Sequence, residues 1–404
     1  MIDGGMIDSR MIDGRMIERR RARPILVFVA LAVVAVVAAS CSSDTDGAGA
    51  SAGSGTVATS STPMPGSVPD TADLPPSSTD TTEADEADEE ASAPDTSGPE
   101  ATAATSPTTT APPPCEQAAV GVTEFTLTAG GADHPVRVFV PSSFSGEVLA
   151  TVIDWHGLGG NGPQQAAITR YEEVAETEGF IVVHPTGVPA VGDDRNSWQL
   201  VSLPGDGARD DLAFADQLID DLIAGWCADP NRIYSTGMSN GGFFTARLVC
   251  EMADRLAAAS SVAGLYHLDD CTPSRPVPYL AYHGTADSVV PFDGSGESVL
   301  LGDGSNPALR VFFEQVMPDE FAEFAADAGC DPAPAVGAIG EVIRYDYTGC
   351  ADDTPMSFFE IPGGGHTWPN WPVADAVAPV FGYTTTDVDA TVDSWAFFRQ
   401  HTLA

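Results

Sequence analysis

Apolar residues in the last three quarters of the chain form short runs that alternate with segments of helical periodicity. The runs are bounded by Gly or Pro, which is typical of strands buried on both faces of a parallel sheet. We predict strands over residues 136–140, 149–155, 180–184, 233–236, 257–263, 279–283, 342–347 and 357–361. The helical periodicity predicts helices over residues 164–178, 212–226, 242–252, 319–328 and 388–400.

Alternation of strands and helices predicts an α/β fold, with a doubly wound, mostly parallel sheet and helices on both faces. Ligands of such sheets bind beyond the carboxyl ends of the strands. Residues that directly follow a predicted strand are therefore the first candidates for a functional site.

The first 41 residues have the pattern of an export signal. Repeats of a short MID or MIE unit offer Met1, Met6, Met11 and Met16 as starts. An Arg cluster then precedes an apolar run over 25–39, which is shorter than the about 20 residues of a membrane span. The run ends in small residues before Cys41, which resembles a bacterial lipobox with Cys41 as the lipidated residue. The alternative is a plain secretory signal, and both interpretations place the protein outside the cytoplasm.

Composition changes twice after this signal. Residues 42–114 are almost entirely small, polar or acidic, and they contain no aromatic residue. Such a segment cannot bury enough apolar surface to offset its ordering entropy, so we predict a disordered linker. Residues 115–404 have the length and pattern of one α/β catalytic domain.

Charge restricts the partners of the chain. It has 58 acidic and 17 basic residues, and its formal net charge is −41. All the basic residues are Arg. This balance excludes a nucleic-acid partner, which requires a basic face. It also disfavours docking on anionic lipid, so we expect membrane contact only through a lipid anchor. The composition leaves the oligomeric state undetermined.

The predicted domain contains six Cys residues. An even number in an exported chain favours three disulfides, although many pairings are compatible with the sequence. We favour the pairs Cys115–Cys227, Cys250–Cys271 and Cys330–Cys350. No two Cys have the CxxC spacing of a zinc or redox site, so no metal is predicted.

A nucleophile motif lies between a predicted strand and a predicted helix. The sequence GMSNGG over 237–242 contains the pattern G-x-S-x-G, in which a tight turn exposes the Ser at the sheet edge. Glycines on either side of Ser239 permit that turn, and the following helix N-terminus favours a developing anion. We predict Ser239 as the nucleophile; the alternative is a Gly-rich turn before a helix.

Two further residues follow strands in the chain order Ser, Asp, His that is typical of α/β-hydrolases. Asp287 follows the strand over 279–283, and His366 follows the strand over 357–361 in the sequence GGGHTWP. We predict Asp287 as the acid and His366 as the base, with His283 supporting the loop of Asp287. The other candidate acids are Asp293, Asp352, Asp353 and Asp387, none of which directly follows an apolar strand.

The segment WHGLGG over 155–160 completes the predicted site. Small residues after this strand are where α/β-hydrolases place the second N–H of the oxyanion hole. We predict the two donors to be the backbone N–H groups of Asn240 and Leu158. His156, Trp198 and Trp368 are predicted substrate contacts, with the two indoles forming an aromatic wall; ordinary rim packing is the alternative for both indoles.

The same segment contains the pattern G-x-G-x-x-G over 157–162, which also occurs in dinucleotide sites. The acidic residue that would bind the ribose is missing after the next strand, which ends at His184. We therefore predict no cofactor.

The motifs together resemble the family of poly(3-hydroxybutyrate) depolymerases, feruloyl esterases and acetylxylan esterases. The resemblance covers residues 120–400 and includes DDLAF over 210–214, CADPNRIY over 227–234, GMSNGG, HGTAD over 283–287 and GGGHTWP. It implies a cofactor-free α/β-hydrolase with a triad of Ser239, Asp287 and His366.

The sequence therefore predicts a secreted serine esterase that hydrolyses esters of a polymer or its fragments through an acyl-enzyme, with feruloyl or acetyl esters of plant polysaccharide as substrates. Two alternatives remain open. One is a polyhydroxybutyrate depolymerase or oligomer hydrolase, and the other is a non-catalytic surface-binding lipoprotein.

The lipobox pattern generates a test of the anchor. We expect wild-type protein in the membrane fraction, because two acyl chains give stable anchoring whereas one gives only marginal binding. The substitution Cys41→Ser should release the protein to the medium or leave uncleaved precursor, as seen by fractionation and mass spectrometry. A wild-type protein that is soluble and has an unlipidated N-terminus would show that the chain is simply secreted.

Overall fold

The computed structural model describes residues 115–189, 194–201, 209–296, 298 and 310–403. The predicted signal peptide, the predicted lipidation site Cys41 and the predicted linker over 42–114 lie outside the described residues. These three assignments stay predictions. No helix in the described part of the chain is long and apolar enough to cross a membrane.

The described elements are twelve strands, β1 to β12, seven α-helices and two short 3-10 helices. The strands are β1 (Gly121–Ala129), β2 (Ala132–Val140), β3 (Leu149–Trp155), β4 (Ile181–Pro185), β5 (Val188–Pro189), β6 (Asn196–Ser197), β7 (Ala228–Met238), β8 (Ala258–Val262), β9 (Tyr279–Gly284), β10 (Ala335–Ile339), β11 (Val342–Tyr347) and β12 (Met356–Ile361). The helices are α2 (Gly162–Thr169), α3 (Tyr171–Glu178), α4 (Asp211–Gly225), α5 (Asn240–Glu251), α7 (Met317–Asp327), α8 (Ala374–Phe381), α9 (Ala390–Phe398), η1 (Val311–Phe313) and η2 (Ala351–Asp353).

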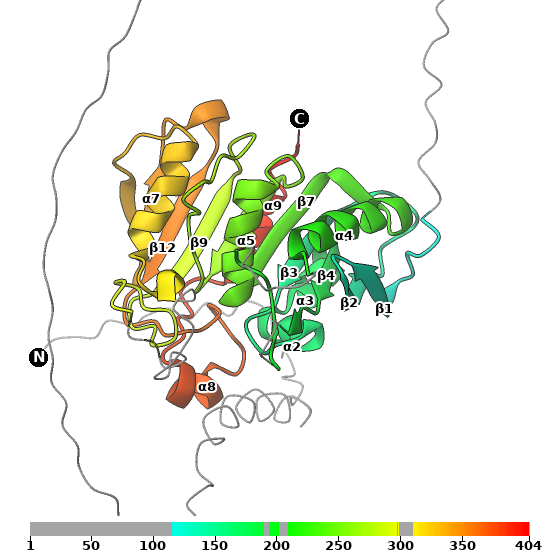
Figure 1. The fold of residues 1–404 in the computed structure, drawn as a ribbon, viewed down its shortest axis with the longest axis horizontal. Coiled ribbons are helices and arrows are strands. Elements are labelled where there is room, and N and C mark those ends of the chain that lie inside the picture. The colour runs from blue at the N-terminus through cyan, green and yellow to red at the C-terminus, as the bar shows by residue number, and fades with distance from the viewer. Residues whose placement is uncertain (1–114, 190–193, 202–208, 297, 299–309, 404) are drawn as a thin grey trace, which may run out of the picture. The chain divides into compact units, whose positions relative to one another are not determined.

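Ten strands form one mixed sheet in the order β1-β2-β4-β3-β7-β8-β9-β12-β11-β10. The central strands β4, β3, β7, β8, β9 and β12 pair in parallel, and antiparallel strands extend both edges. Figure 1 shows α4, α5 and α7 in front of the sheet and α9 behind it. This arrangement confirms the predicted α/β-hydrolase class, with a mostly parallel sheet and helices on both faces.

The central strands are apolar on both faces because each face packs against helices. Along β3, Ile153 and Trp155 belong to the core shared with α4 and α5, whereas Val152 belongs to the core on the opposite face. Every residue of β3 is buried. Continuous burial explains why these strands appear in the sequence as unbroken apolar runs.

The structure differs from the predicted elements in two ways. The single helix predicted over 164–178 is two helices, because Arg170 adopts a left-handed conformation (φ 59°) that ends α2 before α3 begins. The strands β1, β5, β6 and β10, the helix α8 and both 3-10 helices are not among the predicted elements. The strand β1 alternates half-buried and exposed residues, and all five residues of β10 are exposed, so neither has a buried apolar run.

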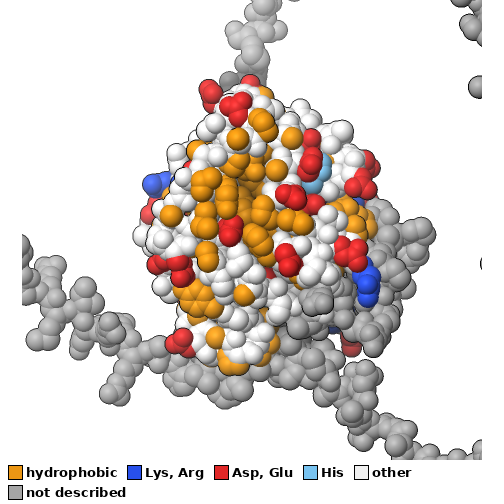
Figure 2. Space-filling model, turned by 90° about the vertical axis from the view of Figure 1, so that its left-hand side faces the viewer, with side chains coloured by type: hydrophobic (Ala, Val, Ile, Leu, Met, Phe, Trp, Pro, Cys, Tyr) orange, Lys and Arg blue, Asp and Glu red, His pale blue; other side chains and the backbone are white. Residues whose placement is uncertain are grey.

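The β10 edge of the sheet is apolar and open. Its residues carry no charge, and Val336 is 66% exposed. Figure 2 views the molecule from this side and shows apolar side chains gathered at the centre, with acidic side chains scattered around them.

Three disulfides staple the domain: Cys115–Cys227, Cys250–Cys271 and Cys330–Cys350. These are the pairs that the sequence led us to favour. The last two close loops with sequence separations of 21 and 20 residues, and loops of this size are worth on the order of 3 kcal/mol each. The first joins the start of the described chain to the segment before β7.

Candidate active site

Ser239 lies at the turn between β7 and α5 in a backbone conformation that few residues adopt. Its φ is 56° and its ψ is −120°, a region that costs of order 1–3 kcal/mol for a residue with a side chain. Its N–H donates to the carbonyl of Val262 at 2.8 Å, which holds the turn. A Cβ at Gly241 would lie 2.0 Å from the carbonyl oxygen of Trp155, so only glycine fits there. These features are those of a nucleophile elbow.

Asp287 and His366 form a buried pair at the neighbouring strand ends. His366 Nδ1 lies 2.8 Å from Asp287 Oδ2. The other carboxylate oxygen accepts the N–H groups of Val289 and Val290 at 2.8 and 2.9 Å. Burial opposes ionisation of Asp287, but His366 and these hydrogen bonds outweigh it and lower the pKa of the carboxyl. The carboxylate of Asp287 is therefore charged, and both of its oxygens accept hydrogen bonds.

The loops that carry the pair are joined to each other. They leave the parallel strands β9 and β12, which are neighbours in the sheet. The N–H of Ala286 donates to Gly364 O at 2.9 Å, and the N–H of Gly363 donates to Thr285 Oγ1 at 2.8 Å. A Cβ at Gly284 would lie 2.2 Å from the carbonyl oxygen of Gly364. This close approach explains why glycine ends β9, because any side chain at Gly284 would overlap the loop that carries His366.

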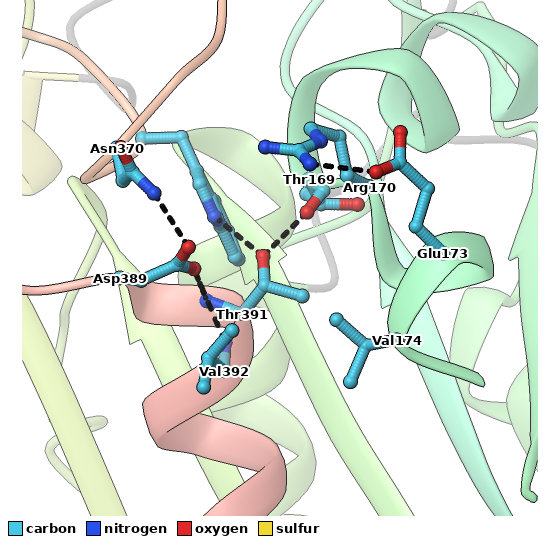
Figure 3. Close-up of a pocket in the computed structure, with 9 residues that line it drawn as sticks. Thr169, Arg170, Glu173, Val174, Asn370, Asp389, Thr391 and Val392 are labelled. Atoms are coloured by element: carbon cyan, nitrogen blue, oxygen red, sulfur yellow. Dashed lines mark hydrogen bonds and ion pairs between the residues drawn. The ribbon is translucent and has the colours of Figure 1, made fainter. Parts of the chain in front are cut away.

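The chain beyond His366 is anchored to the start of α9. Trp368 Nε1–H donates to Thr391 Oγ1 at 3.0 Å, and Thr391 Oγ1–H donates to Thr169 O at the end of α2. Asn370 Nδ2–H donates to Asp389 Oδ2 at 2.6 Å. Figure 3 shows these contacts around a small pocket between α9 and the junction of α2 and α3. His366 therefore has fixed supports on both sides.

Ser239 lies at the same end of the sheet as this pair, because β7, β9 and β12 run in the same direction and the three residues follow the carboxyl ends of these strands. Within the described residues, no hydrogen bond joins Ser239 Oγ to His366. Bonds between a nucleophile and its base are often long until substrate binds. All three side chains are nearly buried, with residue exposures of 8% for Ser239, 5% for Asp287 and 4% for His366.

His283 has the supporting role that the sequence suggested. Its Nε2 lies 2.9 Å from Val290 O and 3.5 Å from Asp287 Oδ2, and its side chain is buried. Among the other candidate acids, Asp293 accepts the N–H of Ser295 and Asp387 accepts the N–H of Glu341. Asp287 is the carboxylate that contacts His366.

The segment 156–160 approaches the elbow closely. A Cβ at Gly157 would lie 3.4 Å from Ser239 Cβ. Among the described residues, no acceptor is bonded to the backbone N–H of Leu158 or of Asn240. Both groups thus remain candidate oxyanion donors, as the sequence suggested.

The structure buries the three predicted substrate contacts, His156, Trp198 and Trp368. Their exposures are 1%, 2% and 1%, so none offers surface to a substrate. His156 Nε2 accepts the N–H of Gly187 at 2.9 Å, and its Nδ1 lies 2.7 Å from Gly157 O. The Trp198 ring packs against Phe244 and Trp155. These three aromatic side chains therefore pack in the interior and support the segments that carry them.

A group of three potential metal ligands occurs in the described part of the chain. It consists of His267, Cys271 and Asp327. Cys271 is bonded to Cys250, so its sulfur is not a free thiolate. His267 Nε2 lies 2.8 Å from Asp327 Oδ2 and pairs with it directly.

Sequence reasoning missed the pair Arg209 and Asp211, whose guanidinium and carboxylate are in contact and nearly buried. In the sequence, Asp211 appears only within the motif DDLAF at the start of a predicted helix. Its contacts lie with Gln199 and Arg209, outside the helix, and no local pattern indicates them.

No protein-family model matches the chain. A feruloyl esterase B of Piromyces equi is 29% identical over 237 residues, which cover 57% of this chain and 42% of that protein. A bifunctional acetylxylan esterase/xylanase of Neocallimastix patriciarum is 29% identical over 160 residues, covering 40% of this chain and 22% of that protein. A feruloyl esterase D of Neurospora crassa is 24% identical over 257 residues, covering 60% of this chain and 76% of that protein.

The chain spans less than half the length of the first two of these relatives. A solved acetyl xylan esterase from Aspergillus awamori matches with a TM-score of 0.43 and 18% identity, over 61% of this chain and 94% of that one. The sequence relatives confirm the predicted resemblance to feruloyl and acetylxylan esterases.

Burial of His156 generates a prediction about stability and pH. Burial lowers the pKa of His156 to about 4, and the bond to Gly157 only partly opposes this. The unfolded chain binds a proton near the ordinary value of 6.5, so stability falls as the pH drops from about 6.5 to about 4. Between pH 7 and 4.5 this group accounts for about 2 kcal/mol of lost unfolding free energy.

Urea unfolding of wild type and His156→Gln at both pH values measures this contribution. We expect a smaller loss on acidification in the variant, whose side chain does not titrate in this range. Burial also lowers the pKa values of His134 and His283, so the variant keeps part of the loss. Equal losses in the two proteins would contradict the assignment to His156.

Proposed function

We propose that this chain is an exported serine carboxylic-ester hydrolase that cleaves feruloyl or acetyl esters of plant polysaccharide through an acyl-enzyme. The observation that carries the proposal is the contact between His366 Nδ1 and the buried, charged Asp287, at the same sheet end as the elbow of Ser239. The names of the relatives support the substrate class.

The first half of the reaction forms the acyl-enzyme. Ser239 Oγ attacks the ester carbonyl carbon while His366 Nε2 accepts its proton. Asp287 then faces an imidazolium, which its negative charge stabilises, and it holds the Nδ1–H so that Nε2 faces the nucleophile. His366 returns the proton to the leaving alcohol.

Charge on the carbonyl oxygen is stabilised by backbone donors. The N–H groups of Asn240 and Leu158 are the proposed pair, and the loss of one such donor typically costs about 3–4 kcal/mol of transition-state stabilisation. Water then attacks the acyl carbon of Ser239 with His366 as base, which releases the acid and regenerates the hydroxyl.

Export is part of the proposal. Three disulfides fit an oxidising compartment outside the cytoplasm. Polymeric plant esters are also met outside the cell, where the predicted signal over residues 1–41 would deliver the enzyme.

The substitution Ser239→Ala tests the nucleophile. We expect kcat for p-nitrophenyl acetate to fall by at least about 10⁴-fold with no change in the thermal midpoint, because the hydroxyl carries the covalent step. Asp287→Asn should lower kcat by about 10³- to 10⁴-fold by favouring the wrong imidazole tautomer. Near-wild-type turnover in Ser239→Ala would remove Ser239 as nucleophile, whereas no turnover in the wild type would favour the non-catalytic alternative.

A substrate panel tests the ester class. We expect kcat/KM for methyl ferulate, or the release of acetate from acetylated xylan, to exceed hydrolysis of 3-hydroxybutyrate oligomers by at least about tenfold, a discrimination that pocket contacts can supply. Product release is measured by liquid chromatography, with Ser239→Ala as the blank for each substrate. Faster cleavage of the oligomers would instead assign the chain to polyester degradation.

A further inference from the structure

A short segment, residues 196–198, bridges the two halves of the proposed oxyanion hole. It holds the segment 156–160 at three points. Asn196 O accepts the N–H of Gly159 at 2.7 Å, Asn196 Nδ2–H donates to Gly160 O at 2.9 Å, and Trp198 Nε1–H donates to His156 O at 3.0 Å. We call residues 196–198 the strap. Through these bonds the strap sets the position of Leu158, which lies between the bonded residues.

The side chain of Asn240, the residue after Ser239 in the elbow, hydrogen-bonds to the strap. Its Oδ1 accepts the N–H of Trp198 at 2.6 Å, and its Nδ2–H donates to the carbonyl of Trp198 at 3.1 Å. These two bonds have opposite polarity and use both ends of one amide. Asp at this position would lack the donor, and Ala would lack both groups.

The strap is also held from its outer side. Arg209 donates to the carbonyl of Ser197 and pairs with the buried Asp211. Asp211 Oδ2 accepts the N–H of Gln199 at 2.7 Å, and Arg247 donates to Gln199 O at 2.7 Å. Because the strap is fixed on this side, a bond to it transmits position from the elbow to the segment 156–160.

We infer that the side chain of Asn240 is a positioning residue that sets the distance between the two oxyanion donors, the N–H groups of Asn240 and Leu158. This inference rests on the proposed ester hydrolysis. The two donors belong to segments about 80 residues apart in the chain, and Asn240 followed by the strap is a continuous hydrogen-bonded route between them.

The expected effect is specific to the transition state. An oxyanion forms only as the carbonyl carbon becomes tetrahedral, so misplaced donors weaken the transition state more than the bound substrate. Functional groups must be held within about 0.5 Å of the productive geometry for full effect. Loss of the Asn240 amide should therefore lower kcat and leave KM nearly unchanged.

Asn240→Ala is the test, because it removes the amide and keeps the backbone N–H. We expect kcat for p-nitrophenyl acetate to fall by at least about tenfold, with KM changed by less than about threefold. Affinity for a trifluoromethyl ketone, which forms a tetrahedral oxyanion on Ser239, should fall by a similar factor. Asn231→Ala is the matched control, because Asn231 is exposed at the opposite end of β7; it should behave as wild type.

A second variant separates positioning from folding. Asn196→Ala removes the side-chain bond from the strap to Gly160, so it should lower kcat with the same KM pattern. The double variant should lose less than the product of the two single effects, because both act on one connection. This measurement also serves if Asn240→Ala does not fold.

Two results would overturn the inference. One is a kcat in Asn240→Ala, or in Asn196→Ala if the former does not fold, that lies within tenfold of wild type. The other is a KM in the same variant that rises by the same factor as its kcat falls. Activity that survives Ser239→Ala would instead reject the proposed function itself, so the two failures are distinguishable.

Discussion

The position of Ser239 depends on two backbones that approach each other more closely than any side chain allows. The carbonyl oxygens of Trp155 and His156 lie within 2.0 and 2.8 Å of where a Cβ of Gly241 would stand. This approach brings the end of β3 against the first turn of α5. It therefore places the segment 156–160 beside Ser239, whose strained conformation the close packing of the surrounding sheet maintains.

Charge at the site is arranged so that burial is compensated. Asp287 would resist ionisation in the interior, yet it receives two backbone N–H groups on one oxygen and an imidazole on the other. His283, a second buried imidazole, approaches the same carboxylate and bonds to Val290 O. These hydrogen bonds offset the desolvation cost of burying the Asp287 carboxylate. The carboxylate in turn holds the His366 imidazole in one orientation.

The residues that surround the site serve mainly to hold loops. His156, Trp198 and Trp368 looked like substrate contacts because they flank catalytic motifs. In the structure each is buried and bonded to backbone or to Thr391. Backbone hydrogen bonds join the loops of Asp287 and His366, and these large buried side chains add to the rigidity that a preorganised site needs.

The sequence by itself determined the elements whose pattern is local: the buried strands, the amphipathic helices, the glycines of the elbow and the order of Ser239, Asp287 and His366. It could not determine β10 or the break at Arg170, because an exposed strand has no buried apolar run and a left-handed residue has no fixed signature.

Only the tertiary structure decided which way the aromatic side chains point and how the strap joins Asn240 to the segment 156–160. These contacts link residues about 40 positions apart through backbone groups, which every residue carries. Any residue can supply a backbone N–H or carbonyl, so such a hydrogen bond does not restrict which residue stands at the partner position. The sequence alone therefore gives no sign of it.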